Sequence, residues 1–172
     1  GSDTITGNGG NDQIDGGLGD DTIDGSGGAD EIAMTVSGAM TVTNTAATGA
    51  GTDTLSSIES AQLTGDTTSD TIDASGFSGT TSINASSGND VITGGSGSNT
   101  ITGGAGDDVI DGTAGTDTII LAIASPATLT NTAATGEGAD TITQIEQATM
   151  TGTPGNDMID TTLFSGSVTL DA

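Results

Sequence analysis

The nine residues Gly16-Gly17-Leu18-Gly19-Asp20-Asp21-Thr22-Ile23-Asp24 decide how the rest of this chain is interpreted. They have the form G-G-x-G-x-D-x-U-x, in which U is a large aliphatic residue. The same pattern runs directly before and after them, in residues 7–15 and 25–33, and a shorter lead-in occupies residues 1–6. Aspartate therefore recurs at every ninth position, as Asp3, Asp12, Asp21 and Asp30.

A second block of the same pattern lies further along the chain. Residues 103–111, GGAGDDVID, are another full copy, and they are flanked by residues 85–93, 94–102 and 112–120. One such motif would mean little in a chain with 30 glycines. Repeated motifs in two phased blocks predict a repeat architecture.

Each nonapeptide is expected to form a turn followed by a very short strand. Glycine permits backbone conformations with positive φ and brings carbonyl oxygens close together. The last three residues alternate outward, inward and outward, so only the aliphatic residue points to the interior. Two nonapeptides then make one coil of a flattened solenoid, and the turns stack in two rows.

A divalent cation between stacked turns can collect backbone carbonyls and two aspartate side chains, which suits calcium with its 6–8 oxygen ligands. Partners lie two motifs apart. The side chains predicted to bind calcium are those of Asp3 with Asp21, Asp12 with Asp30, Asp90 with Asp108, and Asn99 with Asp117. The backbone carbonyls predicted to join them are those of Gly7, Gly9, Gly16, Leu18, Gly94, Ser96, Gly103 and Ala105. Further candidates stand in isolated motifs: Asp53, Asp70, Asp140 and Asp157.

Some of these positions have an alternative interpretation. Asp30 and Asp117 lie at block edges, where a carboxylate without a stacked partner would stay solvated. Asn99 offers a neutral amide oxygen, so its site loses one charge and should bind calcium more weakly. Asp20 and Asp107 occupy the fifth place of the motif and are expected to face solvent.

These nonapeptides resemble those of RTX proteins, the hemolysin-type calcium-binding repeat family, whose motif forms a parallel β-helix that binds calcium. The resemblance implies an all-β fold, a parallel β-roll or β-solenoid with calcium-binding turns. It also implies export through type I secretion in an unfolded state, with folding in millimolar calcium outside the cell. The structural alternative is a disordered linker rich in glycine and aspartate.

The composition agrees with folding that depends on a metal. The 172 residues include 24 acids and no Lys, Arg, His, Cys, Trp or Tyr, which gives a net charge of −24. A chain with such charge and few aromatic residues does not fold by itself, so metal binding and folding should be one event. Without His or Cys, zinc, copper and iron sites are disfavoured. A polyanion is also not expected to bind nucleic acid.

The larger organisation is a duplication. A shift of 87 residues aligns the chain with itself at about half of the positions, most clearly at Thr43–Gly49 against Thr130–Gly136. The predicted units are residues 1–87 and 88–172. The first unit contains a nonapeptide block (1–33), irregular strands (34–64), and a motif with strands (65–87). Together the units should form one continuous solenoid in which wider, calcium-poor coils interrupt the regular ones.

The sequence carries no catalytic set, because the acids repeat with the motif and there is no His. The two aromatic residues, Phe77 and Phe164, occupy matching places and are expected to plug or cap a coil, with partner binding as the alternative. No long apolar run or signal peptide is seen, so no transmembrane segment is expected. The sequence begins and ends inside the repeat pattern and is therefore interpreted as a fragment of a longer protein.

The predicted function is that of an extracellular calcium-binding structural repeat in a bacterial surface layer, surface filament or adhesin, without enzyme activity. Its predicted partner is itself, through end-to-end or lateral calcium-dependent assembly, and a cell-surface glycan is a further candidate partner. The alternative is the RTX repeat region of a type I-secreted toxin, protease or lipase.

Overall fold

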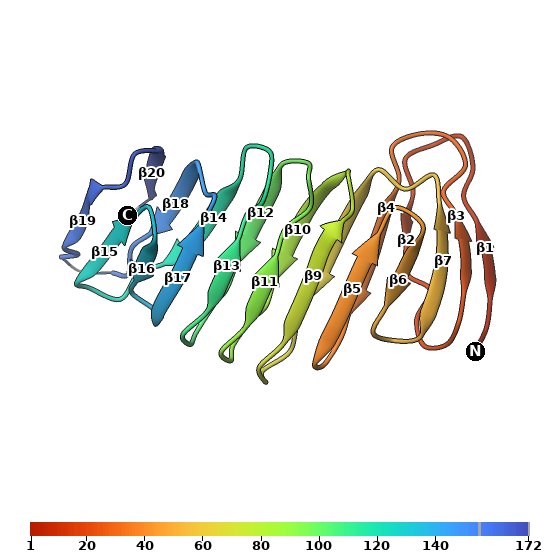
Figure 1. The fold of residues 1–172 in the computed structure, drawn as a ribbon, viewed down its shortest axis with the longest axis horizontal. Coiled ribbons are helices and arrows are strands. Elements are labelled where there is room, and N and C mark those ends of the chain that lie inside the picture. Colours follow the sequence, from red (N-terminus) through yellow and green to blue (C-terminus); the bar gives the residue numbers. More distant parts are fainter. Residues whose placement is uncertain (155, 172) are drawn as a thin grey trace.

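The computed structural model describes residues 1–154 and 156–171, and every regular element in this part of the chain is a β-strand (Figure 1). The strands form two facing sheets, one of 12 strands and one of 8. The larger sheet has the order β1-β3-β7-β6-β5-β9-β11-β13-β17-β16-β15-β19, and the smaller has the order β2-β4-β8-β10-β12-β14-β18-β20.

The strand bounds are β1 (Thr4–Thr6), β2 (Gln13–Ile14), β3 (Thr22–Asp24), β4 (Glu31–Thr35), β5 (Ala39–Thr43), β6 (Ala46–Thr48), β7 (Thr52–Ser56), β8 (Ser60–Thr64), β9 (Thr71–Gly76), β10 (Thr80–Asn84), β11 (Val91–Thr93), β12 (Asn99–Thr102), β13 (Val109–Asp111), β14 (Thr118–Ala122), β15 (Ala127–Thr130), β16 (Ala133–Thr135), β17 (Ala139–Thr143), β18 (Gln147–Thr151), β19 (Ile159–Leu163) and β20 (Ser167–Asp171). Strands β11 to β20 repeat β1 to β10 in order. The boundary of the two units stays a prediction, because the coils stack across it through the pairs β9–β11 and β10–β12.

The nonapeptide blocks form the regular coils that the sequence predicts. Strand β1 pairs with β3 in parallel, with Ile5 opposite Ile23, and β11 pairs with β13 in parallel, with Ile92 opposite Ile110. The strands that lie wholly within these blocks are only two to four residues long, because a new turn begins every nine residues. Each strand therefore contributes about one aliphatic side chain to the interior.

The wide coils contain antiparallel strands, which the prediction of a wholly parallel solenoid does not include. Strand β6 pairs antiparallel with both β5 and β7, and β16 does the same with β15 and β17. The reversal after β5 is a tight turn in which the Thr43 hydroxyl accepts the Ala46 N–H at 3.0 Å. Three strands thus fill one sheet where a regular coil places one.

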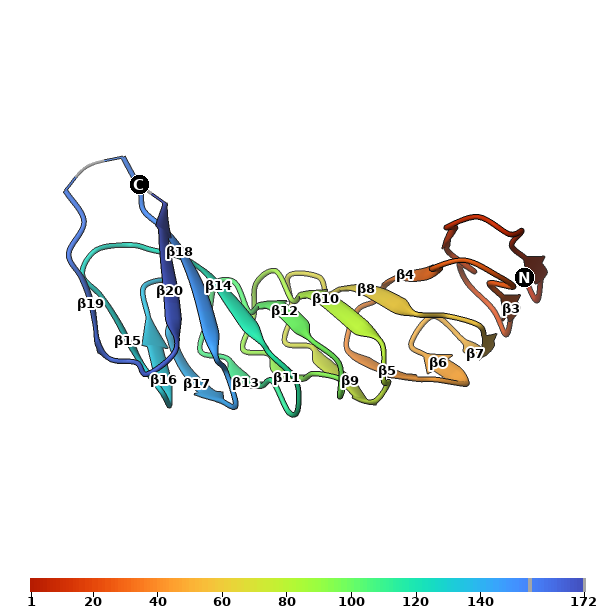
Figure 2. The same ribbon diagram turned by 90° about the horizontal axis from the view of Figure 1, so that it is seen from above.

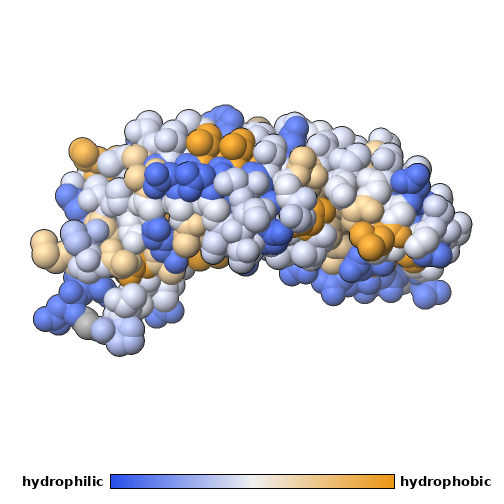
Figure 3. All heavy atoms as spheres, turned by 90° about the horizontal axis from the view of Figure 1, so that it is seen from below, coloured by the Kyte–Doolittle hydropathy of each residue, from blue (hydrophilic) through white to orange (hydrophobic). Residues whose placement is uncertain are grey.

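This insertion makes the two sheets unequal, with 12 strands against 8. Neighbouring strands lie about 4.8 Å apart in any sheet, so the larger sheet is the longer of the two. Figure 2 shows that both ends of the rod turn toward the side of the eight-stranded sheet, and Figure 3 shows the same arch from the opposite side. The rod is therefore curved.

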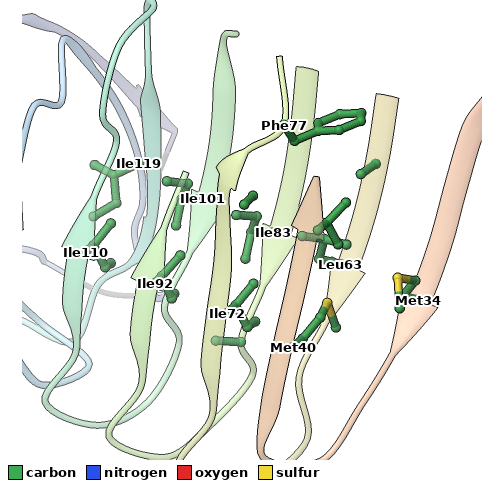
Figure 4. Packing of buried hydrophobic residues seen from close by; sticks show 14 of the residues in the cluster. Met34, Met40, Leu63, Ile72, Phe77, Ile83, Ile92, Ile101, Ile110 and Ile119 are labelled. Carbon is green, nitrogen blue, oxygen red and sulfur yellow. The ribbon is translucent and has the colours of Figure 1, made fainter. Parts of the chain in front are cut away.

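The core consists of ladders of aliphatic side chains between the two sheets. Figure 4 shows one ladder of Ile72, Ile92 and Ile110 facing another of Ile83, Ile101 and Ile119. All six side chains are at most 1% exposed. Burial of one such side chain stabilises a fold by about 1.5–3 kcal/mol, but each short strand supplies so few that the core stays thin.

Phe77 lies in the turn between β9 and β10 and is 1% exposed, and Phe164 lies in the matching turn before β20 and is 8% exposed. Both side chains are packed in the interior. The prediction that these two aromatic residues plug a coil is confirmed. Most of the surface in Figure 3 is polar, with the apolar residues scattered in small groups.

Candidate metal centre

The turns of the nonapeptides hold two residues in the left-handed region. The second residue of the motif has a φ of 79° at Gly17, and 73° and 75° at Ser26 and Ser86. The fourth residue has a φ of 124° at Gly19 and 135° at Gly106. A Cβ atom at Gly106 would overlap the carbonyl of Gly88 in the turn stacked against it, whereas one at Gly17 would meet nothing within 4 Å. The fourth position therefore requires glycine for two reasons, and the second only for its φ.

The ninth residue of a motif stabilises the start of the next turn. The carboxylate of Asp15 accepts the N–H of Gly17 at 2.9 Å, and Asp24 and Asp111 accept the N–H two residues further on at 3.0 Å. This is the local hydrogen bonding by which aspartate favours turns. Sequence analysis missed this role, although an Asp or Asn at that place is visible in the motif.

The aspartates of the sixth position form ladders along the rod. The Asp21 carboxylate accepts the backbone N–H of Asp3 at 2.8 Å, and the N–H of Asp21 is donated in turn to Asp53 Oδ1 at 2.9 Å. The other links have the same form: Asp12 to Asp30 (2.9 Å), Asp70 to Asp90 (2.7 Å), Asp90 to Asp108 (2.9 Å), Asn99 to Asp117 (2.8 Å) and Asp108 to Asp140 (3.1 Å). Each pair predicted two motifs apart is thus stacked in adjacent turns.

In several of these carboxylates the second oxygen has no hydrogen-bond partner among the described residues, whereas Asp12 Oδ2 and Asp70 Oδ2 accept the N–H groups of Asn8 and Asp66. Five buried atoms without a partner occur, the Oδ2 atoms of Asp21, Asp30, Asp90, Asp108 and Asp117. Each belongs to a side chain that is at most 2% exposed. A buried charge without a partner is strongly destabilising, and the sequence has no Lys, Arg or His that could neutralise it. These oxygens therefore require a cation from outside the chain.

Burial also changes the acidity of the ladder residues. Desolvation raises the pKa of Asp140 to about 6, and the negative charge of Asp108 acts in the same direction. Desolvation likewise raises the pKa values of Asp53, Asp90 and Asp108. Protons therefore compete with metal ions for the same carboxylate oxygens.

Asn99 shows what a positively polarised group does in this position. Its amide nitrogen donates to four oxygens, those of Gly95 (3.0 Å), Gly97 (3.0 Å), Gly112 (2.9 Å) and Asp117 Oδ1 (2.8 Å). Its amide oxygen accepts from the Gly95 N–H at 3.0 Å and from the Thr81 hydroxyl at 2.6 Å, which orients the group. The nitrogen, and not the oxygen that was expected to coordinate calcium, faces the carbonyls.

The arrangement around Asn99 identifies which backbone atoms converge in a stacked pair of turns. They are the carbonyls of the second and fourth residues of one turn and the first residue of the next. The prediction named the first and third residues of each turn, and it stays a prediction; the surroundings of Asn99 add the carbonyls of the second and fourth residues as candidates. Carbonyl and carboxylate oxygens without donors form the hard ligand set that calcium prefers. In the described residues no site gathers three acidic side chains, and the converging carbonyls are further oxygens that the backbone can offer.

The remaining candidates divide clearly. Asp53, Asp70 and Asp140, which stand in isolated motifs, are buried in the ladders. Asp157 does not join them, and its carboxylate accepts the Thr153 hydroxyl at 3.2 Å. Gly155 of the same motif and Ala172 of the second unit lie outside the described residues. Asp3 is exposed in the first turn.

The block-edge alternative for Asp30 and Asp117 is wrong, because both are fully buried at 0% exposure. The next turn does stack on them, since Glu59 and Glu146 accept their N–H groups at 2.9 Å. Sequence analysis missed these glutamates, whose only signal is their matching place in the two units. Asp20 and Asp107 are exposed, as predicted.

Comparisons with known proteins agree with this geometry. Residues 1–32 and 84–119 match the family model described as RTX calcium-binding nonapeptide repeat, in four copies. No curated protein matches the chain. No helix in the described residues is long and apolar enough to cross a membrane. The matched residues contain the stacked aspartates with unpartnered oxygens, and these two segments of the chain are therefore RTX-type nonapeptide repeats, a kind of repeat that binds calcium.

Proposed function

We propose that this chain is an extracellular structural repeat of a bacterial surface layer, surface filament or adhesin, and that it folds when it binds calcium. One observation carries the proposal: five buried carboxylate oxygens have no partner among the described residues of a chain that contains no Lys, Arg or His. Calcium bound to these oxygens would neutralise and coordinate them at once.

The energetics favour a chain that is unfolded without metal. Two carboxylates 4 Å apart repel each other by about 4 kcal/mol at a surface-like dielectric, and each ladder stacks several of them. The thin aliphatic core offers little to offset this repulsion. Extracellular calcium modules bind with dissociation constants of about 10⁻⁴–10⁻³ M, so such a chain stays unfolded at cytosolic calcium and folds outside the cell. Magnesium requires a smaller octahedral shell and keeps its waters, and should substitute poorly.

The residues of each turn have distinct tasks in this process. The glycine at the fourth position lets adjacent turns approach, as Gly106 does against Gly88. The sixth residue, such as Asp108, holds the next turn through its Oδ1 atom and leaves Oδ2 for the ion. The ninth residue, such as Asp111, keeps the following turn in shape. Calcium supplies the positive charge that these oxygens lack.

An array function is supported by the repetition of all ten strands, since β11 to β20 follow the plan of β1 to β10. The proposed partner is a second copy of the chain, through end-to-end or lateral calcium-dependent assembly. A cell-surface glycan is the proposed attachment partner.

The match to RTX repeats also supports a second candidate, the repeat region of a type I-secreted toxin, protease or lipase. The calcium-dependent folding is the same in both cases. A catalytic domain encoded next to these repeats would decide for the secreted enzyme or toxin, and further copies of the 87-residue unit would decide for the array.

The test is a calcium titration followed by far-UV circular dichroism and light scattering, with magnesium as the control. A disordered metal-free chain that gains β signal cooperatively near millimolar calcium supports folding on calcium, and growth of large particles in the same range supports assembly. A chain that is already β-structured in chelator refutes the proposal. Monodisperse particles at all calcium concentrations contradict self-assembly alone.

A further inference from the structure

We propose that Glu59 and Glu146, which lie outside the nonapeptides and outside the residues that match the family model, each complete an additional calcium site with the aspartate of the preceding turn. The pairs are Asp30 with Glu59 and Asp117 with Glu146. The inference rests on the proposed calcium-dependent folding and extends it into the wide coils, where calcium-poor turns are predicted.

The two glutamates continue the hydrogen-bond pattern of the ladder. The N–H of Asp30 donates to Glu59 Oε2 at 2.9 Å, as the N–H of Asp12 donates to Asp30 Oδ1 at 2.9 Å. In return the N–H groups of Glu59 and Ser60 both donate to the Asp30 carbonyl at 3.0 Å. A glutamate carboxylate thus occupies the place of the aspartate in the next turn.

The second unit repeats this arrangement with different neighbours. The N–H of Asp117 donates to Glu146 Oε2 at 2.9 Å, and the N–H groups of Glu146 and Gln147 donate to the Asp117 carbonyl at 3.1 and 2.9 Å. The residue two positions before the glutamate is Ser57 in one unit and Gln144 in the other. The glutamate is retained where its neighbour has changed.

The length of the turn explains why glutamate stands there. A regular turn has four residues between its first glycine and its aspartate, as between Gly25 and Asp30, but only Ile58 separates Ser57 from Glu59. Ser57 and Gln144 have φ values of 54° and 52°, so the short turn also passes through the left-handed region. The chain reaches the strand three residues sooner. The glutamate side chain is one methylene longer than aspartate and reaches back to the stacked turn.

An independent observation indicates a cation beside these glutamates. The Oδ2 atoms of Asp30 and Asp117 are buried without a partner in side chains that are 0% exposed. A Cβ atom at Gly25 would lie 2.6 Å from Asp30 Oδ2 and would also overlap the Ser57 carbonyl. The orphaned oxygen and a carbonyl of the short turn therefore converge on one glycine, and none of the described residues donates a hydrogen bond to that carboxylate oxygen.

The same convergence occurs inside the matched repeats. A Cβ atom at Gly7 would lie 2.5 Å from the Gly25 carbonyl and 2.7 Å from Asp12 Oδ2. The short turn of residues 57–59 thus presents its oxygens as a regular turn does. At the second copy, a Cβ atom at Gly112 would meet Asp117 Oδ2 at 2.8 Å and the Gln144 carbonyl.

The row of sites ends at these glutamates. The next turn along the row contains Phe77, and the Thr80 N–H donates to the Glu59 carbonyl at 3.2 Å. A Cβ atom at Gly79 would overlap that carbonyl and would lie 2.8 Å from the Phe77 ring. An apolar plug thus follows the last acidic side chain, so each glutamate serves a single site.

The experiment counts bound calcium at saturation by equilibrium dialysis, with circular dichroism on the same samples. We expect Glu59→Gln and Glu146→Gln each to lose one ion and the double variant to lose two, while the β signal in excess calcium is kept. The matched control is Glu31→Gln, which removes the same charge from the outward face of β4, where Glu31 accepts only the Gln13 amide at 2.7 Å. It should keep every ion.

Glu59→Asp tests the reach of the side chain separately from its charge. The shorter carboxylate should lose the same ion as Glu59→Gln does. Unchanged ion counts in both glutamine variants overturn the inference, and a Glu59→Asp variant that binds normally overturns the argument from turn length. A wild-type chain that binds no calcium refutes the proposed function itself, so the two failures are distinguishable.

Discussion

The side-chain nitrogen of Asn99 lies 2.8 Å from Asp117 Oδ1 and donates a hydrogen bond to it. At the equivalent link of the other unit, Asp12 stacks against Asp30 and both side chains are carboxylates. The neutral amide of Asn99 thus donates hydrogen bonds to oxygens whose equivalents in the other turns need a cation. The two units share one plan but differ in how much metal this row of turns demands.

Conversion of Asn99 to aspartate should create a calcium site. Asn99→Asp removes the amide hydrogens that four oxygens now share and places two carboxylates together. We expect one more calcium ion at saturation by equilibrium dialysis and a higher calcium concentration at the folding midpoint.

The control for this variant is Asn89→Asp, which adds the same charge at the fifth position, where Asp20 and Asp107 already stand. Asn89 is exposed, and its side-chain oxygen accepts the Asp107 N–H at 3.1 Å. Asn89→Asp should leave the ion count unchanged. An unaltered count in Asn99→Asp would show that the wild-type amide already shares its turn with an ion.

Lower pH should stabilise the fold in the absence of calcium, although only in part. Burial raises the pKa of Asp140 to about 6, above the ordinary value of 3.8 that applies to the unfolded chain. Between these two values the folded metal-free chain binds more protons than the unfolded chain, so protonation stabilises the fold and this stability is lost as pH rises through about 6. In chelator, the β signal by circular dichroism should be larger at pH 4.5 than at pH 7.5.

Calcium affinity should change in the opposite direction, because protons occupy the same oxygens. The calcium midpoint should rise as pH falls from 7 to 5. A midpoint that does not vary over this range would contradict the raised pKa values of the ladder aspartates.

The two left-handed positions of the turn should respond differently to substitution. Gly17→Ser should be tolerated at a cost of about 1 kcal/mol, because Ser26 and Ser86 adopt similar φ values and nothing lies within 4 Å of a Cβ there. Gly106→Ser should shift the calcium midpoint severalfold further, because its Cβ would overlap the stacked carbonyl of Gly88. Circular dichroism titrations of the two variants make the comparison, and equal shifts would contradict it.

Removal of the buried aromatic plug should destabilise the calcium-bound fold. Phe77→Ala should cost about 3–5 kcal/mol, measured by denaturant unfolding in saturating calcium, with the number of bound ions unchanged. Phe164→Ala is the matched variant in the last coil, where the side chain is 8% exposed instead of 1%, and its cost should be smaller. An equal or larger loss at Phe164 would show that burial in the stack is not what these rings contribute.

Much of the fold could be predicted because the residue types and the nine-residue spacing of the motif specify the turn, the strand and the buried position. The aliphatic residue of each nonapeptide is buried where the period places it, as Ile23 and Ile110 show. The stacking of Asp90 on Asp108 follows from the spacing of two motifs. These features are local, and they repeat with the sequence.

The wide coil could not be predicted in the same way. Its path depends on β6, which pairs antiparallel with β5 and β7. An alternation of apolar and polar residues predicts a strand but does not specify which strand it pairs with or in which direction. Asp53 stacks on Asp21 although 32 residues separate them in the sequence, and this separation is not a multiple of the nine-residue period. Glu59 was missed for the same reason, since it reaches a ladder through a shortened turn that the motif does not describe.

The unequal sheets have a consequence for any protein that strings such units together. Strands β1 to β10 add six strands to one sheet and four to the other, so one face gains roughly 10 Å more length than the other at the usual spacing of about 4.8 Å per strand. Each unit is therefore wedge-shaped, with its longer face on the side of the larger sheet. A tandem series would follow an arc of constant radius, and the two extra strands of each wide coil set that radius.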